Sequence, residues 1–236
     1  MVMYGTYELP TTIEYNELQI NAQIDNRILT YTRVMNENTL KKNILIESGQ
    51  LQLVPIEPVT SPNHFSSHLL IEFQEEVVLE PKASRKIYTT FPIEWGIFIQ
   101  SNKGATNIDV FSFLRPKYTL YGNTKEGILC RYWKSSTSYE IPPVNQYYEG
   151  IVELKLNNTS SEWIPIKKVV MRAYDMKIYY STEQVYMNAV MNIKNKSVAE
   201  TLFIEGALSE EMVPSRELYK NKVPVVHKKM VMLWGI

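Results

Sequence analysis

The sequence is poor in cysteine and glycine and carries no excess of either charge. Its one cysteine, Cys130, excludes an intrachain disulfide and favours a reducing compartment. Only 9 of the 236 residues are glycine, and neither a GxxxxGK[ST] nor a GxGxxG motif occurs. Because phosphate-binding loops need glycine for close backbone approach, a nucleotide-hydrolysing enzyme is not expected. The 25 basic and 25 acidic residues balance, which argues against a general nucleic-acid binder.

Long apolar segments are also missing. No run approaches the roughly 18 residues that a membrane-spanning helix requires. The N-terminal residues MVMYGTYELP lack a basic region followed by an apolar one, so the sequence predicts no secretory signal. We therefore expect a cytoplasmic protein that does not insert into a membrane.

The sequence does contain many short segments in which apolar and polar residues alternate. In residues 18–25 the apolar residues Leu18, Ile20, Ala22 and Ile24 share one side of an extended chain. Residues 185–193 follow the same pattern, with Val185, Met187, Ala189, Met191 and Ile193 on one side. Turn residues such as Gly122-Asn123 and Pro142-Pro143 separate many of these segments. With 44% hydrophobic residues, the pattern predicts an all-β protein of β-sandwich type.

The 236 residues suffice for one large β domain or for two of ordinary size, and a weak internal repeat suggests two related domains. Residues 70–88 resemble residues 202–219, and each segment precedes a Trp-Gly-Ile sequence, at 95–97 and at 234–236. Duplication of one β domain explains this similarity, and chance similarity between amphipathic strands explains it equally well. The most linker-like stretch is SNKGAT at 101–106, which predicts domains at residues 1–102 and 103–236.

Several distinctive strings along the chain carry a family resemblance. They are LRPKYTLYG at 114–122, GILCRYWKS at 127–135, FPIEWGIF at 91–98, YDMKIYY at 174–180 and the ending MLWGI. In these strings the chain resembles an archaeal family known as domain of unknown function 432. The resemblance implies an archaeal cytoplasmic origin. The family has no assigned activity, so no residue role follows from it.

The predicted hairpin formed by residues 116–121 and 127–133 is the most suggestive binding surface. Alternation places Lys117 and Tyr121 on one face of the first strand, and Arg131 and Trp133 on one face of the second. Pairing these faces gives a wet surface with cations and aromatic rings, able to stack a sugar or base and to hold an anion. The candidate ligand-binding residues are Arg115, Lys117, Tyr121, Arg131 and Trp133. In the alternative interpretation, the same cations and rings pack on one another.

Other candidate chemistry is weaker. His64 and His68, with His227 as a third ligand, suggest a cupin-like metal site, but residues four apart in an extended chain are about 13 Å apart. A polar loop explains these histidines better, and we predict no bound metal or cofactor. Alternation places Cys130 with Ile128 on the core side, which predicts a buried structural thiol. A pair of catalytic carboxylates would have to come from Glu72, Glu75, Glu76, Glu94 or Glu162.

These observations favour a non-catalytic binding or interaction protein that recognises a protein partner or associates with itself. The competing hypothesis is a carbohydrate-binding or carbohydrate-active protein that uses the aromatic and basic hairpin face. A cupin-like metal protein is the third possibility. The aromatic loop at 138–148 fits either an interface or packing on the protein's own sheets.

Overall fold

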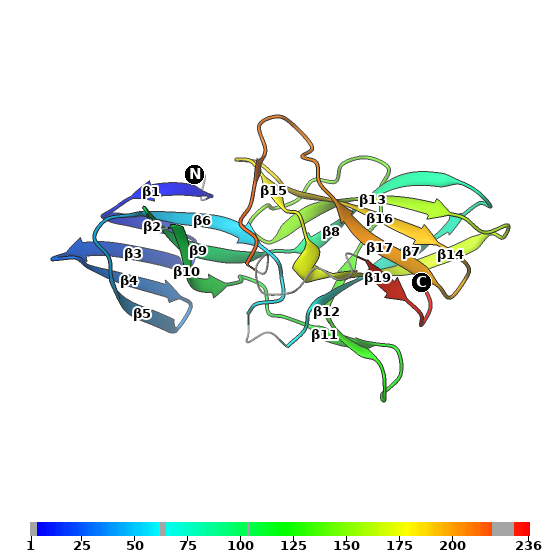
Figure 1. The fold of residues 1–236 in the computed structure, drawn as a ribbon, viewed down its shortest axis with the longest axis horizontal. Coiled ribbons are helices and arrows are strands. Elements are labelled where there is room, and N and C mark those ends of the chain that lie inside the picture. The colour runs from blue at the N-terminus through cyan, green and yellow to red at the C-terminus, as the bar shows by residue number, and fades with distance from the viewer. Residues whose placement is uncertain (1–3, 62–64, 103, 219–228) are drawn as a thin grey trace. The chain divides into compact units, whose positions relative to one another are not determined.

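The structure, a computed structural model, describes residues 4–61, 65–102, 104–218 and 229–236, and it is almost entirely β (Figure 1). The helical structure in these residues is one 3₁₀ turn, η1 (Ala173–Asp175). The predicted all-β, sandwich-like class is therefore confirmed. Among the described residues, no helix has the length and apolar character needed to cross a membrane.

The chain folds into two compact units, each made of separate chain segments. Unit 1 comprises Met1–Val54 and Gly96–Val110, and unit 2 comprises Pro55–Trp95 and Phe111–Ile236. The domain boundary predicted from the sequence lies between residues 102 and 103. In the structure, β9 ends at Ser101 and β10 begins at Gly104, and the two strands belong to one sheet.

Unit 1 is built on two four-stranded sheets. The first has the order β1 (Gly5–Glu8), β6 (Gln50–Ile56), β9 (Glu94–Ser101) and β10 (Gly104–Phe111). The second is the meander β2 (Thr11–Tyr15), β3 (Leu18–Asp25), β4 (Ile28–Met35) and β5 (Asn38–Leu45). Asn26 and Arg27 have φ of 47° and 67°, the backbone of a tight two-residue hairpin turn between β3 and β4. In β3, the side chains of Leu18, Ile20 and Ala22 are buried, as the alternation predicts.

Unit 2 also contains two sheets. One has the order β11 (Tyr118–Tyr121), β12 (Ile128–Ser135), β7 (His68–Leu79) and β14 (Ile164–Arg172). The other has the order β18 (Val213–Pro214), β15 (Tyr179–Tyr180), β16 (Val185–Ile193), β13 (Glu149–Asn158) and β8 (Ser84–Pro92). In addition, β17 (Ala199–Ile204) pairs with β16 and with β19 (Met230–Met232).

The interior of unit 2 lies between its two sheets. The hydroxyl of Thr201 in β17 donates to the carbonyl of Val170 in β14 at 2.6 Å, and the Trp133 indole in β12 donates to Thr90 in β8 at 2.9 Å. Strand β16 pairs in parallel with β13 and is buried on both faces, since Tyr186 and Val190 are buried along with the predicted apolar set.

The two halves of the proposed internal repeat do not fold alike. Residues 70–88 form most of two long strands, β7 and β8, whereas residues 202–219 include the end of β17 and the two-residue β18. Residues 95–97 lie within β9, but residues 234–236 form no strand. The structure therefore gives no support to a duplication.

Candidate functional site

The predicted hairpin exists, but its register differs from the expected one. Strands β11 and β12 pair so that Tyr118 lies opposite Arg131 and Tyr121 lies opposite Ile128. Directly opposed residues point to the same face of a sheet, so Tyr121 and Arg131 lie on opposite faces. The prediction that Tyr121 shares a face with Arg131 and Trp133 is wrong, because a shift of one residue in pairing exchanges the faces of a strand.

This register buries much of the expected wet face. Arg131 is 2% exposed and Tyr121 is 1% exposed, while Arg115 and Lys117 are exposed. The half-buried Trp133 turns its indole N–H to the other sheet, as described above. The five candidate residues therefore do not form one open surface, and this arrangement gives no support to sugar stacking there.

Each buried member of this set has a structural partner. The guanidinium of Arg131 lies 5.8 Å from the centre of the Tyr118 ring, and the ammonium of Lys168 lies 5.4 Å from the Tyr121 ring. The Tyr121 hydroxyl donates to the carbonyl of Gly235 at 2.9 Å and accepts the N–H of Trp234 at 3.0 Å. Cations do pack on aromatic rings here, but in pairs other than those expected from the sequence.

The histidine hypothesis falls largely outside the described residues, because His64 and His227 are not among them. His68 begins β7, and its Nδ1 lies 3.0 Å from the Ser67 hydroxyl. Burial lowers the pKa of His68, and the Arg172 charge lowers it further. In the described part of the chain, no three His, Cys, Asp or Glu side chains are grouped as metal ligands.

Cys130 is a buried free thiol, as the alternation predicts. Burial raises its pKa to about 12, so it stays protonated near neutral pH. Since the thiolate is the nucleophile, this setting does not suit nucleophilic catalysis.

Of the five carboxylates considered as catalytic candidates, Glu94 has the most unusual environment. It lies at the start of β9 and is fully buried, at 0% exposure, whereas Glu72, Glu76 and Glu162 each face a lysine at 3.0–3.9 Å. Its Oε2 accepts the backbone N–H groups of Thr60 at 3.0 Å and Ser61 at 2.8 Å.

A second buried carboxyl accompanies it. Glu57 follows β6 and is 1% exposed, and its charge and that of Glu94 act on each other. Within the described residues, neither Glu57 oxygen accepts a hydrogen bond of good geometry, and Glu94 Oε1 also lacks one. Glu57 is not among the carboxylates predicted from the sequence. Its position between Pro55 and Pro58 carries no signal that the chain will bury it.

Burial dominates the electrostatics of this pair. It raises the pKa of Glu57 to about 8, with smaller increases from the charges of Glu217 and Glu94 and an opposing effect from nearby backbone N–H groups. It also raises the pKa of Glu94 to about 8, against the lowering effect of two backbone N–H groups and the Arg131 charge. Burial lowers the pKa of Arg131 in turn, and the Glu94 charge opposes that shift.

We call Glu57, Glu94 and Arg131 the buried acid–arginine cluster. Two of the Arg131 nitrogens, Nε and Nη1, lack hydrogen-bond partners among the described residues. A protonated carboxylic acid near neutral pH can act as a general acid, and strongly perturbed pKa values gather at functional sites. However, the three side chains are almost completely covered, so no substrate reaches them in this conformation. The two carboxyls of the cluster hold protons near neutral pH, but no open path connects them to a substrate.

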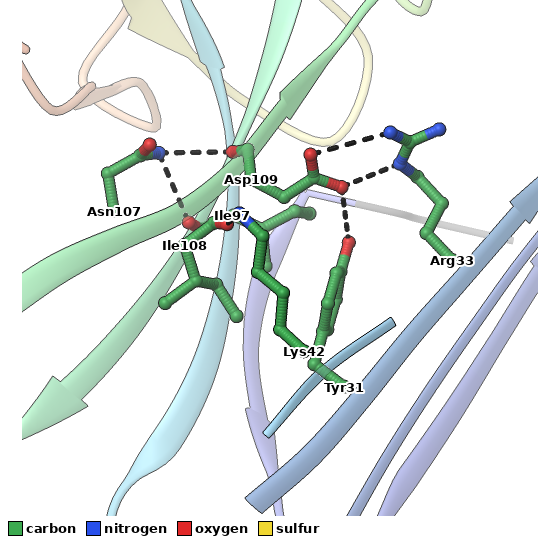
Figure 2. Close-up of polar contacts among 7 residues, drawn as sticks. All are labelled: Tyr31, Arg33, Lys42, Ile97, Asn107, Ile108 and Asp109. Carbon is green, nitrogen blue, oxygen red and sulfur yellow. Dashed lines mark hydrogen bonds and ion pairs between the residues drawn. The ribbon is translucent and has the colours of Figure 1, made fainter. Parts of the chain in front are cut away.

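Unit 1 contains a different polar cluster, centred on Asp109 of β10 (Figure 2). Its Oδ2 accepts the Tyr31 hydroxyl at 2.8 Å and Arg33 Nε at 2.6 Å, which joins β4 of one sheet to β10 of the other. The Lys42 ammonium donates to the carbonyl of Ile108, and the Asn107 amide donates to the carbonyl of Asp109 at 3.1 Å. Because the buried charge is paired and hydrogen-bonded, this cluster is structural.

In the portions of the chain described by the structure, each unit has a surface hollow open to a ligand. The hollow in unit 1, about 410 Å³, is lined mostly by polar loop residues and by the exposed Leu45. The hollow in unit 2, about 300 Å³, lies beside the end of β7 and the start of β8. We call the latter the Trp163 groove, and it is lined by Val77, Val78, Leu79, Glu80, Arg85, Ile87, Tyr139 and Trp163.

The Trp163 groove has the chemistry of a contact surface. Trp163 is 61% exposed and Tyr139 is 81% exposed, and Val78 is also exposed. Glu80 and Arg85 form an ion pair at the same groove. The sequence does not predict this site, because its residues come from three separated parts of the chain: residues 77–87, Tyr139 and Trp163. A single tryptophan just before a strand does not by itself predict a binding site.

The fold and these sites define an all-β, sandwich-like protein with an exposed apolar groove. The chain belongs to the family described as "Protein of unknown function (DUF432)", whose match covers residues 3–233. This confirms the resemblance inferred from the sequence. A search of curated proteins finds no match, and neither does a search of solved structures.

Proposed function

We propose that this protein is a non-catalytic binding module that holds a protein partner at the Trp163 groove. The exposure of Trp163 and Tyr139 around an apolar hollow is the observation that carries the proposal. A cytoplasmic location belongs to the same proposal, and the single buried thiol of Cys130 supports it.

The composition of the groove supports a protein partner. Large exposed apolar side chains grouped around a hollow mark interaction sites more often than single exposed ones do. Tryptophan, tyrosine and arginine are the residues that most often dominate the binding energy of protein interfaces, and the groove contains one of each. The partner is a different protein or a second copy of this chain.

The test places a photo-crosslinking amino acid at position 139 of the full chain, in the cells that make it. A matched control carries the same group at Leu45, an equally exposed apolar residue of unit 1. We expect a discrete crosslinked species from position 139 that position 45 does not give. If the partner is a second copy, that species has twice the mass of the chain.

The partner is then purified, and its affinity is measured with wild-type protein and with Trp163→Ala. Loss of a central interface tryptophan costs about 2 kcal/mol or more, so we expect affinity to fall by about thirtyfold or more. The proposal fails if the two positions give the same crosslinks, or if Trp163→Ala binds the identified partner as wild-type protein does.

Carbohydrate binding is the second candidate, and the same two rings favour it. Exposed aromatic rings stack on sugar faces, while Glu80 and Arg85 offer hydrogen bonds to hydroxyl groups. A glycan array probed with wild-type protein and Trp163→Ala separates the two candidates. If the wild-type protein binds glycans selectively and Trp163→Ala abolishes this binding, the ligand of the groove is a sugar and not a protein.

A further inference from the structure

The outer edge of β8 begins to pair with another segment and then stops. Tyr88 exchanges two backbone hydrogen bonds with Ser138, at 2.8 and 2.9 Å, on the side of β8 away from β13. Backbone groups of successive residues in an antiparallel strand point to alternate sides. The N–H and carbonyl of Lys86, two residues before Tyr88, therefore also point away from β13.

The segment after Ser138 does not continue this ladder. Glu140 would be the next residue to pair with Lys86, but its N–H donates to the Ser138 hydroxyl at 3.0 Å. Pro142 and Pro143 follow, and proline offers no N–H to a ladder. In the part of the chain that the structure describes, no hydrogen bond reaches the outward backbone groups of Lys86.

This open edge lies beside the Trp163 groove. Arg85 and Ile87, the neighbours of Lys86 in β8, line the groove, as does Tyr139, the residue after the bridge. The charged side chains of Arg85 and Lys86 are each held by an acidic residue. Arg85 is paired with Glu80, and Lys86 Nζ lies 3.5 Å from Glu153 on the neighbouring strand β13.

We infer that the occupant of the Trp163 groove is an extended peptide segment of the partner, which adds to the outer edge of β8 as a further strand. Its backbone pairs with Lys86, and one of its apolar side chains enters the groove against Trp163. Unpaired edge groups are a ready template for another strand, and strand addition combines backbone pairing with pockets for alternate side chains. This inference rests on the proposed function and specifies its partner.

The probe is a library of random twelve-residue peptides displayed on phage and selected against the full-length protein. Selected peptides are then measured by calorimetry against wild-type protein, Lys86→Pro, Lys86→Ala and Trp163→Ala. Lys86→Pro removes an N–H that the pairing with β13 does not use, and proline is tolerated at strand edges. Lys86→Ala is the matched control, because it removes the side chain and keeps the N–H.

We expect both Lys86→Pro and Trp163→Ala to weaken binding by at least tenfold, while Lys86→Ala changes it less than threefold. Amide hydrogen exchange of the wild-type protein gives a second readout that needs no variant. The Lys86 amide should exchange fast in the free protein and become protected in the complex, whereas the Ile87 amide is slow in both.

The inference is overturned if the library yields no binder, or if selected peptides bind without protecting the Lys86 amide. It is also overturned if Lys86→Pro is folded and binds them as tightly as Lys86→Ala does. A crosslinked partner that depends on Trp163 but not on Lys86 would refute strand addition and leave the proposed function intact. If neither Trp163→Ala nor Lys86→Pro affects binding, strand addition and the proposed function are both refuted.

Discussion

Replacing Glu57 or Glu94 by glutamine tests whether the folded protein holds two protons in its buried acid–arginine cluster at neutral pH. Burial raises both pKa values from 4.5 to about 8. When folding raises the pKa of a carboxyl, the folded state holds the proton more tightly than the unfolded chain does. The resulting contribution to stability is complete at a pH below the unfolded pKa, and it is lost as the pH rises through about 8. Wild-type protein should therefore lose stability between pH 5 and pH 9.

The size of the effect follows from the proton bound in the folded state. Between pH 6 and pH 9, a carboxyl with a pKa near 8 keeps its proton over about two of the three pH units, while the unfolded chain has already released it. One pH unit corresponds to about 1.4 kcal/mol, so each carboxyl lowers the free energy of unfolding by about 3 kcal/mol over this range. Glutamine has nearly the same shape and does not titrate, so Glu57→Gln and Glu94→Gln should each remove about this much of the pH dependence.

The assay is urea unfolding followed by tryptophan fluorescence at pH 6, 7.5 and 9. Glu75→Gln, an exposed position on β7, serves as the control and should keep the wild-type pH dependence. At pH 9 the two buried variants should unfold at higher urea concentrations than wild-type protein, with an unchanged slope. If all variants and wild-type protein lose stability in parallel from pH 6 to pH 9, the two carboxyls are not protonated in the folded state.

Three further predictions concern stability and reactivity. Asp109→Ala removes the carboxylate that forms a buried ion pair with Arg33 in unit 1 and should cost about 3–5 kcal/mol in urea unfolding; a loss below about 1 kcal/mol would contradict this. Tyr121→Phe removes the hydroxyl that donates to the Gly235 carbonyl and should cost about 1 kcal/mol; no change in thermal melting would contradict this. Cys130 should resist a thiol reagent in native protein and react fully in urea, so rapid native labelling would show that it is accessible.

Strands were predictable where apolar residues recur at every second position. Residues 18–25 form β3, in which Leu18, Ile20 and Ala22 are buried and Ile24 is partly exposed. Residues 185–193 form β16, in which the predicted apolar side is buried but the other side is largely buried too. The prediction of a strand works because every second residue of an extended chain shares one face, and recognising this needs no knowledge of the neighbouring strands.

The prediction of the candidate surface was wrong at the step that required knowing how two neighbouring strands pair. Alternation correctly separated the two faces of β11 and of β12, but it could not say which faces meet. That choice depends on the number of residues in the turn between Tyr121 and Ile128, where a single residue exchanges the faces. Arg131 consequently joins Glu94 in the interior instead of Tyr121 on a wet surface.

Sites formed by residues from distant segments could not be predicted from the sequence for a related reason. Glu57 directly follows β6 and Glu94 begins β9, and nothing local marks either as a buried acid. Trp163 and Tyr139 meet at one groove although neither lies in a strand. Such sites depend on long-range pairing, which a local pattern does not encode.

The aromatic loop at 138–148 shows how one segment serves both purposes that its composition allows. Tyr147 accepts the indole N–H of Trp95 on its carbonyl at 3.0 Å, and the Tyr148 ring lies 5.4 Å from that of Phe113, so this end packs on the protein itself. Tyr139, at the other end, remains exposed at the Trp163 groove. The bridge between Ser138 and Tyr88 holds the backbone directly before Tyr139, so a partner that binds Tyr139 has less conformational entropy to remove, which favours binding.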